Sequence, residues 1–221
     1  MSELLPEIPF AEIRGWMFDL DGTLMDTDDQ SVETLTHRLR FLGEARARRL
    51  ARHAVMFGET PMNSVYTVMD MLGIDPLAVA VQRLLRGSAP YDFRLMEGVR
   101  PLIETLAARV PLAVVTTRST AAAQAFLTQH ALGELFRVVV TCESTRRVKP
   151  HPEPVRFAAA ALDLPPEACV MVGDTTVDVL SARRAGAWAV GVLCGFGEED
   201  ELHRVGAHLV LRSTAELIEK I

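Results

Sequence analysis

Basic clusters, cysteine pairs and long apolar runs are all missing from this chain of 221 residues. Its 29 acidic residues outnumber its 23 basic ones, which leaves a net charge of −6, and the basic residues form no tail or block. Nucleic-acid phosphates attract clustered Lys and Arg, so we expect no nucleic-acid partner. The longest apolar runs fall short of the ~20 residues that cross a bilayer, so we expect no membrane partner either.

Cysteine usage and the first residues of the chain indicate a reducing compartment. Cys142, Cys169 and Cys194 are odd in number and widely spaced, which fits neither a disulfide framework nor a zinc site. The opening stretch "MSELLPEIPF" carries acidic residues where a secretion signal needs basic ones. We therefore expect a cytoplasmic protein, and the sequence leaves a monomer and a homodimer both open.

Apolar runs rich in β-branched residues alternate with helical patterns through the second half of the chain. Strands are predicted at 111–117, 136–141, 168–174, 188–193 and 207–211, and helices at 121–131, 152–164 and 177–186. A further strand ends at Phe18. This alternation predicts an α/β fold with a doubly wound, Rossmann-like parallel sheet and helices on both faces.

The stretch from about residue 28 to residue 94 has a different character. Its apolar residues recur at helical spacing, its segments end at Gly or at a turn, and it contains no convincing strand. We therefore predict two domains, an α/β core formed by residues 1–25 and 95–221 and an all-helical cap formed by residues 26–94. The cap would be inserted directly after the first strand.

Polar residues follow several of the predicted strands at the point where each strand ends. The first strand leads into Asp19 and Asp21, the strand at 111–117 ends in Thr116 and Thr117, and the strand at 168–174 ends in Asp174, with Asp178 four residues later. Lys149 precedes the helix at 152–164, and only it and Lys220 are lysines among 23 basic residues. The carboxyl ends of parallel strands share one edge of the sheet, so these groups should converge there.

Such a cluster suits phosphoryl transfer. Converging carboxylates repel one another unless a cation joins them, and a few hard oxygen ligands suit Mg²⁺ together with a substrate phosphate. A lysine and a hydroxyl can hold that phosphate while one aspartate attacks phosphorus and a second moves the proton.

Four segments in this order resemble the motifs of the haloacid dehalogenase superfamily, and the layout is most similar to its phosphoglycolate phosphatase-like branch. They are "DLDGT" at 19–23, "VVTTR" at 114–118, "KPHPEP" at 149–154 and "GDTTVD" at 173–178. The resemblance covers the whole chain and implies a phosphatase core with a small helical cap. It also implies Mg²⁺ as the cofactor.

The resemblance assigns the catalytic and metal-binding roles to four aspartates. Asp19 matches the nucleophile and a Mg²⁺ ligand, and Asp21 matches the general acid/base whose backbone carbonyl also binds the ion. Asp174 matches the acidic metal ligand. Asp178 matches an acidic group that supports the metal site or serves as an alternative ligand.

The phosphate-binding roles fall on three further residues. Thr116 matches the hydroxyl that binds phosphate, and Lys149 matches the lysine that holds phosphate and steadies Asp19. Thr117 occupies a substrate-binding position where an Asn is often found. This departure concerns a substrate contact and leaves the chemistry unchanged.

The implied activity is Mg²⁺-dependent hydrolysis of a small phosphorylated metabolite through an aspartyl-phosphate. Dehalogenation is disfavoured because those enzymes lack an acid at the position of Asp21. Phosphonate cleavage is disfavoured because it needs a cap lysine and residues 1–148 contain none. A phosphomutase acting on a sugar phosphate and a pyrophosphatase both stay open, and a non-catalytic binding protein is the weakest alternative. Substrate choice should depend on the cap, in particular on "FGETPMN" at 57–63.

Overall fold

The computed structural model describes residues 5–26, 39–40, 43 and 93–221. The chain divides into two compact units, one made of Met1–Thr27 and Phe93–Ile221 and the other of Asp28–Asp92. The predicted helical cap and its 57–63 segment lie almost wholly outside the described residues, so both stay predictions. The first unit carries the sheet and all of the predicted site residues.

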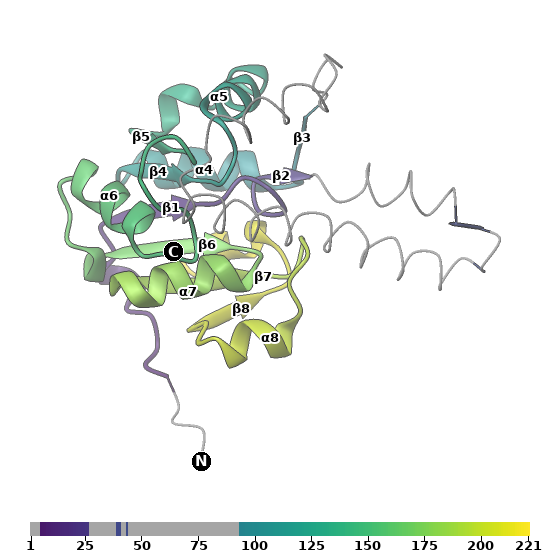
Figure 1. The fold of residues 1–221 in the computed structure, drawn as a ribbon. Helices are drawn as coiled ribbons and strands as arrows, with labels where there is room; N and C mark the ends of the chain where they lie inside the picture. Colours follow the sequence, from purple (N-terminus) through teal and green to yellow (C-terminus); the bar gives the residue numbers. More distant parts are fainter. Residues whose placement is uncertain (1–4, 27–38, 41–42, 44–92) are drawn as a thin grey trace. The chain divides into compact units, whose positions relative to one another are not determined.

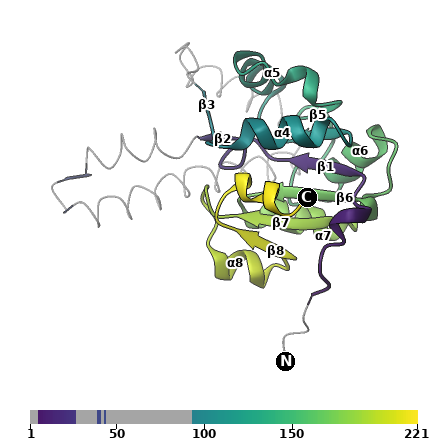
Figure 2. The ribbon, with the colours of Figure 1, turned by 180° about the vertical axis from the view of Figure 1, so that it is seen from behind.

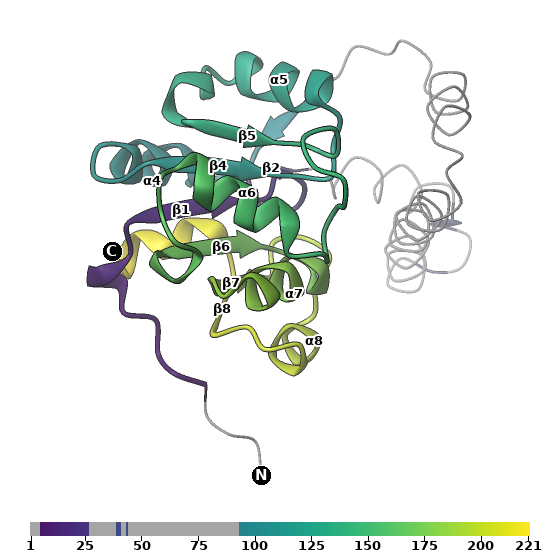
Figure 3. The ribbon, with the colours of Figure 1, turned by 60° about the vertical axis from the view of Figure 1, so that its left-hand side comes forward.

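A six-stranded sheet forms the centre of the first unit, and every neighbouring pair of strands in it is parallel. Figure 3 shows the strands stacked in the order β5-β4-β1-β6-β7-β8. Their bounds are β1 Gly15–Phe18, β4 Leu112–Val115, β5 Val138–Val140, β6 Cys169–Gly173, β7 Trp188–Val192 and β8 Leu209–Leu211. The predicted α/β class and parallel sheet are confirmed.

Helices cover both faces of this sheet. They are α4 Val99–Ala107, α5 Thr120–Gln129, α6 Glu153–Ala161, α7 Thr176–Ala185 and α8 Glu199–Arg204. The helices α6 and α7 lie in front of the sheet in Figure 3, whereas α4 lies in front of it when the molecule is seen from behind in Figure 2. The chain winds outward from β1 through β4 to β5 and then crosses to β6 on the other side of β1, so the sheet is doubly wound (Figure 1).

Strict alternation of side chains along the strands builds two hydrophobic cores. In β1, Trp16 and Phe18 pack on the face covered by α4 and α5, while Met17 packs on the face covered by α6, α7 and α8. Leu112 and Val114 repeat this division in β4 against Ala113 and Val115. The central strands are thus buried on both faces, which explains why they read as continuous apolar runs.

Two short strands differ from the sequence expectation. Met25–Asp26 forms β2 and Arg94–Leu95 forms β3, and the two pair antiparallel at the predicted boundary between the domains. The prediction of a block without strands that reaches Arg94 is therefore wrong at this end. A strand of two residues is too short to show an alternating hydrophobic pattern in the sequence. Within the described part of the chain, no helix is long and apolar enough to cross a membrane.

Candidate functional site

The site lies where the direction of chain winding reverses, between β1 and β6. Asp19 directly follows β1, and its backbone N–H donates to Val172 O of β6 at 2.9 Å. Asp174 directly follows β6. In doubly wound sheets the strands diverge at this point and leave a crevice beyond their carboxyl ends, which is where ligands bind.

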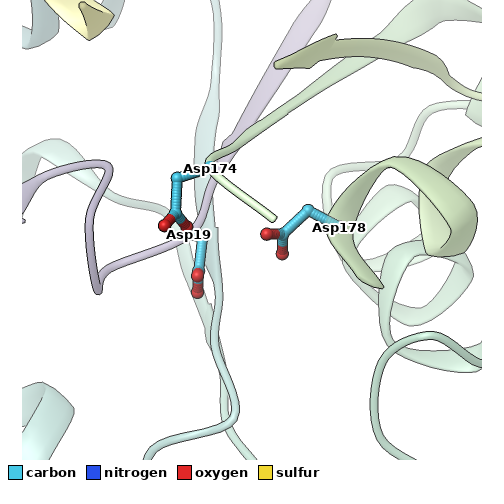
Figure 4. A group of neighbouring side chains, drawn as sticks. All are labelled: Asp19, Asp174 and Asp178. Carbon is cyan, nitrogen blue, oxygen red and sulfur yellow. The ribbon is translucent and has the colours of Figure 1, made fainter. Parts of the chain in front are cut away.

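Three buried aspartates converge at this switch point. Asp19, Asp174 and Asp178 each offer a carboxylate oxygen, and these oxygens all lie within 4.8 Å of one another. Figure 4 shows Asp19 and Asp174 projecting from the two strand ends and Asp178 approaching from the first turn of α7. All donors in the group are hard oxygens, which match a cation such as Mg²⁺ better than a thiophilic metal.

Lys149 is almost fully enclosed within this cluster, with only 4% of its surface exposed. Its ammonium lies 2.8 Å from Asp19 Oδ1 and 2.6 Å from Asp178 Oδ1, and it donates to Val115 O at 2.9 Å. Burial alone would lower the pKa of Lys149, but the charges of Asp178 and Asp19 outweigh it and hold that pKa above its ordinary value. The side chain therefore stays protonated, and its position is fixed by two hydrogen bonds and by the ion pair with Asp19.

Asp178 uses both of its oxygens within the chain. Oδ1 accepts from Lys149, while Oδ2 accepts from the Thr175 backbone N–H at 3.1 Å and from the Thr175 hydroxyl at 2.5 Å. The contact with the Thr175 backbone N–H is one half of a capping box at the start of α7, in which the Thr175 side chain accepts from the Asp178 backbone N–H in return. Asp178 thus joins the helix start to Lys149.

The surroundings of Asp19 disfavour the charged form of its carboxylate. Burial raises the pKa of Asp19 from 3.8 to about 7, with Asp178 and Asp21 adding to the rise and Lys149 opposing it. Among the described residues, Asp19 Oδ1 accepts no hydrogen bond, although the Lys149 ammonium is close to it. A further cation beside this oxygen would give it a partner and would favour the charged form of Asp19.

Two glycine-containing loops bring backbone against Asp174. A Cβ on Gly195 would lie 2.1 Å from Asp174 Oδ2, and one on Gly22, which has a φ of +64°, would lie 2.4 Å from the same oxygen. Between Gly195 and Gly197, the Phe196 N–H donates to that oxygen at 2.8 Å. Sequence reasoning missed this loop, although the "GFG" at 195–197, one residue beyond the strand predicted at 188–193, was a usable signal.

Thr116 and Arg118 line the end of β4. The Thr116 N–H donates to Val140 O at 2.9 Å, its hydroxyl oxygen accepts from the Arg118 backbone N–H at 3.1 Å, and Thr117 follows half-buried. The Arg118 guanidinium pairs with both carboxylate oxygens of Asp21, at 2.7 and 2.5 Å. Sequence reasoning assigned no role to Arg118, because its partner lies 97 residues away and no local pattern marks the contact.

The predicted site residues fall into two groups in the structure. Asp19, Lys149, Asp174 and Asp178 form one cluster, with Thr116 at the end of the neighbouring strand. The side chain of Asp21 is engaged by Arg118 and lies outside the group of three carboxylates.

The chain thus has a doubly wound sheet with carboxylates and a lysine at its switch point, where α/β proteins bind their ligands. The family model of the haloacid dehalogenase-like hydrolases matches residues 16–192, and the chain belongs to this family. One relative is a pyrophosphatase PpaX of Halalkalibacterium halodurans, 28% identical over 209 residues that span 94% of this chain and 96% of that protein.

Solved structures agree on the fold. A haloacid dehalogenase-like hydrolase from Streptococcus pneumoniae is 24% identical, with a TM-score of 0.69 over 95% of this chain and 99% of that one. A predicted phosphoglycolate phosphatase from Haemophilus somnus is 21% identical, with a TM-score of 0.65 over 95% and 98% of the two chains. The predicted family is thus confirmed, and the solved structures agree with the predicted fold.

Proposed function

We propose that the protein is a Mg²⁺-dependent phosphatase that hydrolyses a small phosphorylated metabolite through an aspartyl-phosphate on Asp19. The observation that carries this proposal is the buried Asp19 carboxylate, held 2.8 Å from the Lys149 ammonium at the switch point of the sheet. A carboxylate fixed in this way can act as a nucleophile, and the lysine offsets the charge of an incoming phosphate.

In the first step an Asp19 oxygen forms a bond to phosphorus while the bond from phosphorus to the leaving oxygen breaks. Asp21, as general acid, gives its proton to that leaving oxygen. In the second step Asp21 takes a proton from water as the water oxygen attacks phosphorus. Asp19 then leaves as a free carboxylate and inorganic phosphate is released, so both aspartates return to their initial states.

The residues present fit a divalent cation. Asp19 Oδ1 accepts no hydrogen bond among the described residues, and carboxylate oxygens of Asp19 and Asp174 lie within 4.8 Å of each other. The carboxylates of Asp19 and Asp174, with the backbone carbonyl of Asp21, would hold the ion. Bound there, Mg²⁺ would neutralise phosphate charge and act as a Lewis acid.

We assign phosphate binding to residues at the end of the neighbouring strand β4 and to the buried Lys149. The Thr116 hydroxyl and Thr117 would donate to phosphate oxygens, and Lys149 would hold one oxygen while keeping Asp19 in line. Asp178 keeps Lys149 in place through its 2.6 Å contact with the ammonium. The segment within residues 26–94 that we predict to be an all-helical cap would set substrate choice.

A pyrophosphatase is the second candidate function. It is supported by the relative named pyrophosphatase, which matches nearly the full length of both chains. The same nucleophile and acid would serve, since a phosphoanhydride also ends in a transferable phosphoryl group.

The test is metal removal followed by a substrate screen. After exhaustive chelation, hydrolysis of p-nitrophenyl phosphate should fall to background and should return when Mg²⁺ is added. A screen of phosphoglycolate, sugar phosphates, nucleotides and pyrophosphate then ranks the substrates by kcat/KM. Undiminished activity in the chelated enzyme would contradict the metal-dependent mechanism.

A further inference from the structure

Arg118 reaches from the loop after β4 to the side chain of the proposed general acid. Its Nε donates to Asp21 Oδ2 and its Nη2 to Asp21 Oδ1, so the guanidinium fork engages both oxygens. The side chains of Arg118 and Asp21 are 21% and 20% exposed, so the pair lies at the edge of the site, where a ligand can approach it.

Several contacts hold the guanidinium in place. The Arg118 backbone N–H donates to the Thr116 hydroxyl, and Arg118 Cζ lies 5.7 Å from the centre of the Phe93 ring. The Phe93 carbonyl in turn accepts from Gln129 Nε2 at 2.8 Å. A planar fork that is positioned in advance loses little freedom when it binds an anion, so Arg118 is well prepared for such a ligand.

This pair conflicts with the role of Asp21 in the reaction. An acid must present one carboxyl oxygen, with its proton, to the leaving oxygen of the substrate. Both Asp21 oxygens now face N–H groups of Arg118, so at least one must turn away before it can reach the substrate. The guanidinium N–H groups that this Asp21 oxygen leaves can then donate to an anionic group of the substrate, in a charge-assisted hydrogen bond.

We propose that Arg118 binds a second anionic group on the leaving portion of the substrate, and that this exchange releases Asp21 for proton transfer. The inference rests on the proposed function, because it assigns a substrate class to the same site. That class is small phosphate esters or anhydrides whose leaving group carries its own carboxylate or phosphate. Recognition of that charge is then coupled to availability of the acid.

The test compares two small esters that differ in this charge. Phosphoglycolate carries a carboxylate on its leaving group, whereas 2-hydroxyethyl phosphate carries a neutral hydroxyl of similar size. The wild-type enzyme with Mg²⁺ should prefer phosphoglycolate by at least about 30-fold in kcat/KM, the range expected when a charged partner is removed. In Arg118→Met this preference should collapse towards one, mainly through a higher KM for phosphoglycolate.

Two further variants sharpen the comparison. Arg118→Lys keeps the charge without the fork, so it should restore part of the preference. Arg137→Met removes another arginine–aspartate pair, in which Arg137 contacts Asp163 at 2.5 Å with both side chains more than half exposed. Because the Arg137 backbone pairs with the start of β4, away from the site, this variant should keep the full preference.

The possible outcomes separate cleanly. Equal losses on both esters in Arg118→Met, with the preference retained, would show that Arg118 only orders Asp21 and would overturn the inference. A wild-type enzyme that hydrolyses p-nitrophenyl phosphate but shows no preference between the esters would also overturn it while sparing the proposed function. A wild-type enzyme that hydrolyses none of the three substrates with Mg²⁺ would defeat the proposed function, and this inference with it.

Discussion

The surroundings of Lys149 restrict which side chain can occupy its position. A buried ammonium is costly to desolvate unless it is paired, and here two carboxylates and one carbonyl compensate for the lost water. All three oxygens lie close to a single nitrogen. A compact point charge satisfies this geometry, whereas a planar guanidinium fork does not.

We therefore predict that Lys149→Arg, although it conserves charge, lowers kcat/KM by on the order of 10²-fold or more. The exposed Lys220 near the end of the chain provides the matched control, and Lys220→Arg should behave as wild type. Steady-state kinetics on both variants checks the prediction. Equal, near wild-type values would show that Lys149 does not hold the phosphate.

We predict that His208, at the edge of the sheet beside β7, makes stability depend on pH. Its Nδ1 accepts from the Ala189 backbone N–H at 3.0 Å, and the Arg183 guanidinium contacts its Nε2. Burial and then the Arg183 charge lower the pKa of His208 from 6.5 to about 4. The unfolded chain therefore binds a proton at a higher pH than the folded chain does.

The stability contributed by neutral His208 should be fully present above about pH 6.5 and lost as the pH falls towards about 4. Urea unfolding across this window should show a steeper loss of free energy of unfolding for wild type than for His208→Gln. His203→Gln, which changes an exposed histidine of α8, should follow the wild-type curve. Parallel curves for wild type and His208→Gln would contradict this role.

At the scale of elements, the loop after β7 shapes the site although none of its side chains is assigned a chemical step. Its backbone packs directly on Asp174, with the Phe196 N–H fixing one carboxylate oxygen. A Cβ on Gly195 would overlap that oxygen, whereas a Cβ on Gly133 would meet nothing within 4 Å. The two glycines therefore form a matched pair for the same substitution.

We predict that Gly195→Ala lowers kcat/KM by about 10²-fold, since displacing a catalytic group by ~1 Å has that effect. Gly133→Ala should leave kcat/KM unchanged. Circular dichroism and thermal unfolding of both variants would show whether the fold is retained. Activity in Gly195→Ala equal to that in Gly133→Ala would mean that the loop does not position Asp174.

At the scale of the whole molecule, the ends of the strands were the part of the structure that the sequence predicted best. Buried parallel strands must be apolar throughout, so a polar residue at the end of a run marks the sheet edge, as it does at Asp19, Thr116 and Asp174. The contact between Arg118 and Asp21 could not be predicted in this way. Long-range pairing depends on how loops fold back over the edge, and no sequence periodicity records it.

Short elements and backbone contacts escaped prediction for a related reason. The β2–β3 ribbon has two residues in each strand, too few to show alternation. The close approach of Gly195 to Asp174 is a contact between two loops, visible only once β6 and β7 lie side by side. Roles for the cap residues 26–94 stay predictions.

Phosphoryl transfer to Asp19 is the central claim, and it can be measured directly. Wild-type enzyme turning over p-nitrophenyl phosphate with Mg²⁺ is quenched rapidly in acid, digested and analysed by mass spectrometry. The peptide that contains Asp19 should gain the mass of one phosphoryl group, hydroxylamine should remove it, and Asp19→Asn should lose both the modification and turnover while keeping its fold. An unmodified Asp19 peptide during turnover, together with near wild-type kcat in Asp19→Asn, would contradict the claim.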